Sequence, residues 1–281
     1  MADVHAFSYA GALLSGVDEF GTTWSIEQMS GWTDGVALRV QREARSQQDG
    51  EWDVQPLRAA REVTLMGKAE AVSHAALEQS QRRFTALPLT GSMTGSSDEG
   101  DLTADGYLSE AQRFQHLSGL VAGWALTFVA PDPLLYGPPT FESTGLEGVA
   151  GSGRVWPRVW PRDWGVPAGT TPGAIEVPNV GTAAYWPRLR IDGPVDNPVV
   201  TLNETGDWVR YNGSLTAGQY LDIDCANRRV LLNGFVSRAP QVEFSGRFLA
   251  VPVGGGSMSW NDDSASPDAK FSVFGREGAW L

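Results

Sequence analysis

Apolar runs with a period of two are the clearest pattern in the C-terminal half of the chain. Leu221 and Ile223 alternate with Asp222 and Asp224, so one face of an extended segment is apolar and the other is polar. Similar runs, rich in β-branched and aromatic residues and separated by Gly, Asn and Pro, fill residues 175–233. This pattern predicts antiparallel strands that pack as a β-sandwich.

The N-terminal half shows the same alternation and one change of period. Strands are predicted over residues 23–27, 36–42, 61–66, 107–116 and 122–129. Residues 70–87 carry apolar side chains at spacings of three, four and seven, with no Gly or Pro inside and with Pro88 directly after them. This spacing predicts an α-helix. Residues 91–105 are small, polar and acidic, which predicts a long exposed loop.

Two consecutive prolines, Pro138 and Pro139, divide the chain. Proline ends hydrogen-bonded ladders and favours an extended link. We therefore expect an N-terminal domain at residues 1–138 and a C-terminal domain at residues 139–281, in which the Gly-, Pro- and Trp-rich residues 139–174 form a connecting segment. A chain of 281 residues is long enough for two cores.

Composition and charge narrow the class of protein. The 33 Gly, 17 Pro and 11 Trp favour a mainly β fold with many turns and with aromatic rings in thin cores. The net charge of −12 and the lack of a Lys- and Arg-rich run argue against nucleic-acid binding through phosphate neutralisation. No signal peptide or membrane span is expected. The single cysteine, Cys225, is predicted to be a buried structural thiol.

A series of short motifs runs through both halves in a fixed order. In the C-terminal half the motifs are Asn179-x-Gly181, Pro187-x-x-x-Ile191-x-Gly193, Asn197-Pro198, Gly218-x-x-Leu221-x-Ile223-Asp224 and Asn233-Gly234. In the N-terminal half they are Trp24-x-Ile26, Gly31-Trp32, Asp49-Gly50, Arg61-x-Val63-Thr64-Leu65-x-Gly67 and Asp132-Pro133-Leu134-Leu135-Tyr136-Gly137. Taken in this order, the motifs resemble the distal tail protein family of long-tailed (siphovirus) bacteriophages.

The resemblance implies a fold and a role. It implies a mainly β protein, in which an N-terminal β-barrel or sheet domain with one helix builds a tail-tube-like ring and a C-terminal galectin-like β-sandwich lies outside the ring. The role it implies is that of a structural virion protein, assembled in the host cytoplasm, without catalysis, cofactor or membrane insertion. The ring is expected to be a homohexamer at the distal end of the tail, joining the tail tube to the tail tip, baseplate and host-binding proteins.

An acidic cluster in the predicted loop is a candidate for the lumen of such a ring. The cluster consists of Asp98, Glu99, Asp101 and Asp105. Negative charge in a lumen repels DNA that passes through it and keeps the DNA from binding. We therefore expect these residues near the ring lumen or the adjoining ring, and we expect no specific binding of nucleic acid.

Carbohydrate binding is the first alternative function that the residues leave open. Trp156, Trp160 and Trp164 are candidates for a platform on which sugars of a host-surface polysaccharide stack, together with Trp186 and Trp208. Rings of this size also fill the core of a small sandwich, and we favour core and linker roles for them.

A glycoside hydrolase is the second alternative. Asp222 and Asp224 point to one side of a predicted strand, and Glu243 is a possible third carboxylate. A solvated strand face explains the same pattern and is the preferred interpretation. No metal site is expected, because the acidic segments 98–101 and 261–264 lack EF-hand spacing and the three histidines, His5, His74 and His116, form no zinc motif.

Overall fold

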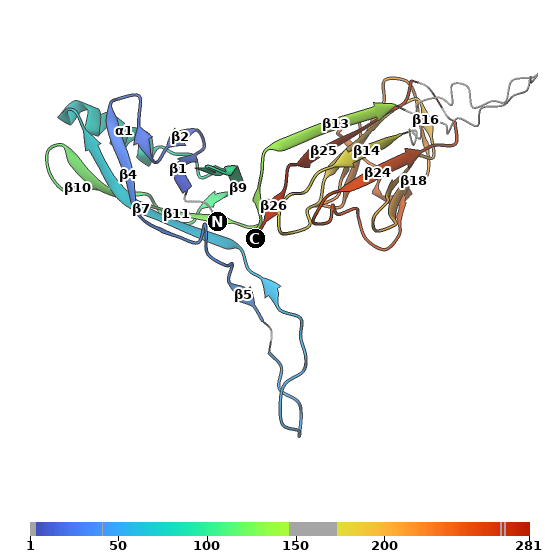
Figure 1. The fold of residues 1–281 in the computed structure, drawn as a ribbon, viewed down its shortest axis with the longest axis horizontal. Coiled ribbons are helices and arrows are strands. Elements are labelled where there is room, and N and C mark those ends of the chain that lie inside the picture. The colour runs from blue at the N-terminus through green and yellow to red at the C-terminus, as the bar shows by residue number, and fades with distance from the viewer. Residues whose placement is uncertain (1–3, 41, 146–172, 265, 267) are drawn as a thin grey trace, which may run out of the picture. The chain divides into compact units, whose positions relative to one another are not determined.

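The computed structural model describes residues 4–40, 42–145, 173–264, 266 and 268–281. The chain folds into two compact units, Met1–Pro138 together with Trp280–Leu281, and Pro139–Ala279 (Figure 1). Most of the connecting segment predicted at residues 139–174, including Trp156, Trp160 and Trp164, lies outside the described residues.

The first unit is built on one large antiparallel sheet with the strand order β2-β1-β8-β9-β11-β7-β4-β3. These strands are β1 (Val4–Tyr9), β2 (Ala12–Leu13), β3 (Gly16–Val17), β4 (Thr22–Ser30), β7 (Arg61–Ala71), β8 (Thr90–Ser97), β9 (Gly100–Leu108) and β11 (Val121–Ala130). Two further strands, β10 (Arg113–His116) and β12 (Leu135–Tyr136), pair with β11 and β9 respectively.

Strict alternation explains the two longest strands of this unit. Every second residue of β7, from Arg61 to Ala71, is buried, as is every second residue of β11, from Ala122 to Ala130. The two strands pair over ten consecutive residues. Because successive side chains of a strand point to opposite faces, this register places one continuous apolar face on the core side of the sheet.

The helix α1 (His74–Thr85) covers that apolar face. It was predicted to begin at residue 70, which is wrong, because β7 continues to Ala71 and Val72 is exposed. Ser73 caps the helix by accepting a hydrogen bond from the backbone N–H of Ala76 at 3.2 Å. The buried residues of α1, which are Ala76, Leu77, Ser80 and Phe84, share one face of the helix.

The predicted loop over residues 91–105 is also wrong, since these residues form the hairpin β8–β9. The register pairs Met93 with Ala104, and both are buried, whereas Ser92 and Asp105 pair on the opposite face. Gly95 faces the core as well, where an added Cβ would lie 2.8 Å from the indole of Trp32. Small residues are needed here because a large ring packs directly against the strand.

An arm, residues 33–60, leaves the sheet between β4 and β7 (Figure 1). Its strands are short: β5 (Leu38–Arg39) and β6 (Leu57–Arg58) make two residue pairs, and Ala44 and Glu51 form a bridge farther out. The strand predicted over residues 36–42 therefore exists only at its centre. No core lies beneath the arm to continue the pairing, because the residues of β5 and β6 are exposed on both faces.

Aromatic rings fill the core between the sheet and α1. Trp24, Phe84 and Trp124 pack with ring centroids 5.3 to 5.8 Å apart, and Phe114 adds a partly buried ring at the edge of this group. Trp280 returns to the same unit after the second unit is complete and packs against this core. Tilted and edge-to-face contacts of this kind add to the free energy of burial.

The second unit is a β-sandwich of two principal sheets. One sheet has the order β13 (Pro139–Gly145), β25 (Lys270–Arg276), β15 (Arg188–Asp192), β20 (Tyr220–Asp224), β21 (Arg229–Leu232) and β22 (Val236–Ser237). The other has the order β14 (Ala174–Val177), β24 (Gly256–Asn261), β17 (Val199–Leu202), β18 (Asp207–Tyr211) and β23 (Val242–Phe244). Smaller elements of this unit are the pair β16 (Val195–Asp196) and β19 (Ser214–Leu215) and the 3-10 helix η1 (Ala239–Gln241). The terminal strand β26 (Ala279–Trp280) pairs with β12 in the sheet of the first unit.

The two sheets meet through the alternating residues that the sequence identified. Leu221 and Ile223 are buried, and Trp260 of β24 packs on Phe271 of β25 with ring centroids 6.0 Å apart. A mainly β chain with a C-terminal sandwich was predicted, and this prediction is confirmed.

Candidate assembly interface

The arm carries the most concentrated set of exposed apolar side chains in the first unit. Five of them are between 39% and 63% exposed, namely Leu38, Val40, Trp52, Val54 and Leu57. Backbone hydrogen bonds run along the arm from the Ala59 N–H to the Ala37 carbonyl (2.8 Å) out to the Arg45 N–H and the Gly50 carbonyl (3.1 Å). An isolated two-stranded ribbon is marginally stable in water, and clustered exposed apolar residues mark interaction sites.

The hairpin β8–β9 presents hydroxyl groups and carboxylates on the face opposite the core. Ser92 lies across from Asp105, Thr94 from Thr103, and Ser96 from Asp101. The Ser92 hydroxyl donates a hydrogen bond to the Asp105 carboxylate. Asp101 and Asp105 therefore project from one strand face, while Asp98 and Glu99 form the exposed turn between the strands. These four residues are called the hairpin acids below. The structure thus brings the four acids onto a single hairpin.

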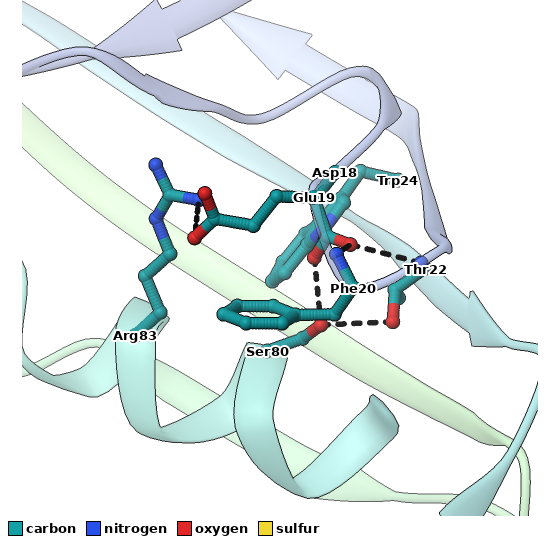
Figure 2. A network of polar contacts seen from close by, with 7 residues as sticks. All are labelled: Asp18, Glu19, Phe20, Thr22, Trp24, Ser80 and Arg83. Carbon is teal, nitrogen blue, oxygen red and sulfur yellow. Dashed lines mark hydrogen bonds and ion pairs between the residues drawn. The ribbon is translucent and has the colours of Figure 1, made fainter. Parts of the chain in front are cut away.

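A network centred on Asp18 fastens helix α1 to the turn between β3 and β4 (Figure 2). One carboxylate oxygen accepts from the backbone N–H groups of Phe20 and Thr22, both at 2.9 Å. The other accepts from the Trp24 indole at 2.9 Å and from the Ser80 hydroxyl at 2.6 Å. The hydroxyl oxygens of Ser80 and Thr22 lie 2.8 Å apart. All donors to Asp18 come from the β3–β4 turn, β4 or α1.

The protonation state of Asp18 follows from this network. Partial burial alone would raise the pKa, but the hydrogen bonds from Ser80, Trp24 and two backbone amides outweigh it and hold the pKa of the Asp18 carboxyl below its ordinary value. Beside it, Arg83 of α1 pairs with Glu19 at 2.6 Å (Figure 2). The network joins α1 to the β3–β4 turn and to β4, which is a role in the fold.

The proposed catalytic carboxylates do not come together. Asp222, predicted to face solvent, is buried, because Arg188 and Arg190 of the neighbouring strand lie across it with nitrogen–oxygen distances of 3.0 and 2.8 Å. Asp224 accepts hydrogen bonds from the backbone and side chain of Asn227. Glu243 lies in the other sheet, opposite Arg210 of β18.

Histidines that are distant in the sequence lie close together in the structure, which sequence reasoning missed. The rings of His74 and His116 have centroids 6.5 Å apart and line a shallow groove with Glu78 and Gln81 of α1. A His74 ring nitrogen lies 2.8 Å from the Gly119 carbonyl, and a His116 ring nitrogen lies 2.9 Å from Gln81. Across the described ranges, no group of three or more His, Cys, Asp or Glu is placed to hold a metal ion.

The acidic side chains of segment 261–264 accept hydrogen bonds from neighbouring protein groups. Asp262 is buried and accepts from the Ser264 hydroxyl, while Asp263 accepts from Asn197 at 2.9 Å. The prediction for Cys225 is confirmed: the thiol is buried, and burial raises its pKa to about 12. A thiol in this state is an inert packing group.

Half of the eight tryptophans that the structure describes are buried core residues. Trp24, Trp32, Trp124 and Trp260 are buried, and Trp186 remains 48% exposed. The three residues of the proposed sugar platform lie outside the described residues. In the part of the chain that the structure describes, no helix has both the length and the apolar character needed to cross a membrane.

Comparison with known proteins gives one family and one fold. Residues 180–273 match the family model described as "Siphovirus-type tail component, C-terminal domain". The crystal structure of the Dit (gp 19.1) protein of phage SPP1, described as a paradigm of hub adsorption apparatus in phages that infect Gram-positive hosts, is similar over 98% of this chain and 99% of that chain, with a TM-score of 0.62 and 14% identity. No curated protein matches the chain by sequence.

A chain of the phage P2 baseplate, in its activated conformation with Ca, is more distantly similar. It has a TM-score of 0.47 and 11% identity, over 92% of this chain and 91% of that chain. At 14% identity, the similarity to the SPP1 protein establishes a shared fold, and that fold extends over both units. The P2 similarity adds nothing to this conclusion.

The fold and the family match define the chain as a structural component of a phage tail. Residues 180–273 are similar to the C-terminal domain of siphovirus-type tail components, and the resemblance to distal tail proteins seen in the sequence is confirmed. Its place is therefore in the tail of the virion.

Proposed function

We propose that the chain forms a closed homohexameric ring at the distal end of a siphophage tail, and that this ring joins the tail tube to the tip, baseplate and host-binding proteins. The N-terminal domain, residues 1–138, makes the ring contacts. The C-terminal domain, residues 139–281, is a peripheral galectin-like sandwich. The observation that carries the proposal is the arm, with its five exposed apolar side chains.

The arm needs a partner surface for a physical reason. Each exposed Leu, Val or Trp keeps apolar area in water at a cost of roughly 25 cal/mol per Å². The two residue pairs between β5 and β6 give little compensation, because short ribbons are not stable alone. Identical neighbours around a cyclic axis cover such a feature in every copy at once, and a closed ring leaves no arm unpaired.

The wall of the channel is proposed to include the outer face of the β8–β9 hairpin. That face carries Ser92, Thr94, Ser96 and the hairpin acids Asp101 and Asp105. Residues 1–138 contain 18 Asp and Glu against 9 Lys and Arg, a net charge of −9. A hydroxyl-rich, negatively charged wall repels the phosphate backbone and lets DNA pass without binding.

The role is proposed to be non-catalytic. Two arginines neutralise Asp222, and Glu243 lies in the opposite sheet from Asp222 and Asp224. The arrangement offers no pair of carboxylates facing one glycosidic bond. Among the described residues, the shallow groove at His74 and His116 contributes a single carboxylate, that of Glu78.

Ring formation by arm contacts is tested on the purified full-length chain by light scattering and negative-stain microscopy, alone and mixed with tail-tube protein. The wild-type chain is expected to give closed six-fold rings. Leu38→Asp and Leu57→Asp are expected to abolish them while leaving the melting temperature almost unchanged, because exposed positions contribute little to monomer stability.

The matched control is Phe235→Asp, which places the same charge on an exposed apolar position of the second unit. It is expected to keep the rings. Rings that survive both arm substitutions would contradict the arm contacts. A wild-type chain that stays monomeric at every concentration, and also with tail-tube protein, would contradict ring formation itself.

A further inference from the structure

Arg61 is a buried cation at the start of β7. The side chain is 2% exposed, because alternation along the strand turns it toward the core together with Val63. Its Nε donates to the carbonyl of Pro133 at 2.9 Å. Its Nη1 donates to the carbonyls of Gly31 and Trp32, at 2.8 and 3.0 Å, and lies 3.3 Å from that of Asp34.

These carbonyls belong to two segments that leave the sheet in different directions. Residues 31–34 are where the chain leaves β4 and enters the arm, and Pro133 is where it leaves β11 on its way to β12. Because β7 pairs with both β4 and β11, Arg61 lies between the two exits. One planar guanidinium therefore holds the root of the arm and the start of the segment toward the second unit.

The root of the arm is a fixed turn. Gly31 has a φ of +83°, and an added Cβ would lie 1.8 Å from the carbonyl oxygen of Glu62. Its backbone N–H donates to the Asp34 carboxylate at 2.7 Å. Trp32 is buried and packs edge-on against Phe7, with ring centroids 5.2 Å apart. Because this turn is rigid, the position of its carbonyl groups determines the direction in which the arm leaves the sheet.

Stability alone does not account for an arginine at this position. Burial lowers the pKa of Arg61, which reflects the cost of keeping a cation away from water. Its Nη2 has no acceptor among the described residues, and unpaired buried donors are costly. An apolar side chain of similar length would avoid both costs. What the fork of donors adds is geometry, since its planar N–H groups fix several acceptors in one plane.

We propose that Arg61 is a positioning residue that sets the direction in which the arm leaves the sheet and couples the arm to the segment that leaves β11. The coupling rests on contacts within the first unit. Only its consequence for assembly rests on the proposed ring.

Hydrogen exchange of the full-length chain tests the positioning. In Arg61→Met the backbone amides of residues 31–38 and 134–136 are expected to exchange at least tenfold faster than in wild type, while those of α1 are unchanged. Arg58→Met is the matched control, because Arg58 is an exposed arginine of the arm itself. It is expected to leave both segments as they are. Unchanged exchange in Arg61→Met, or equal acceleration in α1, would overturn the proposal.

If Arg61→Met does not fold, hydrogen exchange of Arg61→Lys tests the same positioning role. Lysine keeps the charge and the alkyl stem, but its single ammonium group cannot reach both segments in one plane. Exchange is expected to rise in at least one of the two segments, with α1 unchanged. No change in either segment would mean that the fork has no positioning role.

Light scattering on Arg61→Lys then separates the two proposals. Loss of rings together with faster exchange at residues 31–38 is expected. Rings that persist despite a loosened root would overturn the part of Arg61 in assembly and leave the ring itself intact. If the wild-type chain forms no ring, the ring proposal fails, and the exchange result still decides the positioning of the arm.

Discussion

Replacing Asp18 by Asn is the sharpest test of how the first unit holds its helix. The substitution keeps the shape of the side chain and removes its charge. The oxygen that accepts from the amides of Phe20 and Thr22 can remain, but an NH₂ group then faces the indole N–H of Trp24 and the hydroxyl of Ser80. Two hydrogen bonds to a charged acceptor are lost, and one donor meets another donor.

The size of the effect follows from these contacts. A hydrogen bond to a charged group contributes about 1.5–3 kcal/mol, and Asp18 is only partly buried, so the lower end applies to each of the two. A rotation of the Ser80 hydroxyl recovers part of one. We expect a loss of about 2 kcal/mol in the free energy of unfolding, which for a unit of this size lowers the melting temperature by about 4–8 °C.

Urea unfolding and calorimetry on the full-length chain provide the measurement, with Asp101→Asn as the control for an exposed carboxylate on a strand. A double-mutant cycle with Trp24→Phe isolates the indole bond. A loss below about 0.5 kcal/mol, or full additivity with Trp24→Phe, would refute the claim that the charged network fastens α1.

The pH dependence gives a second check on Asp18. Its pKa in the folded state lies below its ordinary value, and the unfolded value is about 3.9. A depressed folded pKa contributes stability that is fully present above the unfolded pKa and is lost as the pH falls through the folded pKa. The difference between wild type and Asp18→Asn should therefore be constant at neutral pH, begin to fall near pH 4, and be lost only once the pH is below the folded pKa.

Four further outcomes are expected. Asp222→Ala leaves the cations of Arg188 and Arg190 without their carboxylate partner and should destabilise the second unit by about 3 kcal/mol in thermal unfolding. A negligible loss in Asp222→Asn would show instead that the ion pairs contribute no stability. Residues 139–279 expressed alone should unfold in one cooperative β-type transition, and an unstructured fragment would show a shared core. The thiol of Cys225 should resist a thiol reagent at pH 8 and react in denaturant; since its folded pKa of about 12 is raised, its contribution to stability is present below about pH 8.5 and is lost as the pH rises above that value. Replacing the four hairpin acids by Lys should create DNA binding that weakens with salt, and a ring that still ignores DNA at low salt would place the hairpin away from the channel.

The sequence predicted the elements whose determinants are local. Alternation at Leu221 and Ile223 identified β20, and Asn233 and Gly234 have positive φ, 51° and 78°, as the two central residues of a type I′ turn require. Several motifs that carry the family resemblance are turn and packing positions of this kind. Asn179, for example, donates to the carbonyls of Ala183 and Pro252 and accepts from the Gly181 amide.

Features that depend on distant residues could not be predicted. The hairpin β8–β9 has small inward residues because the indole of Trp32 lies against Gly95, and from the sequence such a segment is indistinguishable from a polar loop. Asp222 is buried by arginines of another strand. The carbonyl groups that Arg61 binds belong to Gly31 and Pro133, which lie 30 and 72 positions away in the sequence.

The return of Trp280 and Leu281 to the first unit makes the second unit an insertion rather than an appendage. The chain leaves the first unit at Pro138 and comes back to it at Trp280, so the sandwich is held at both of its ends. A module held in this way can be exchanged for another whose ends lie close together, whereas simple truncation after Pro138 removes a ring from the core of the unit that remains. The sandwich can therefore vary while the first unit is preserved. The condition is that the replacement leads the chain back to β26, the strand that contains Trp280 and pairs with β12.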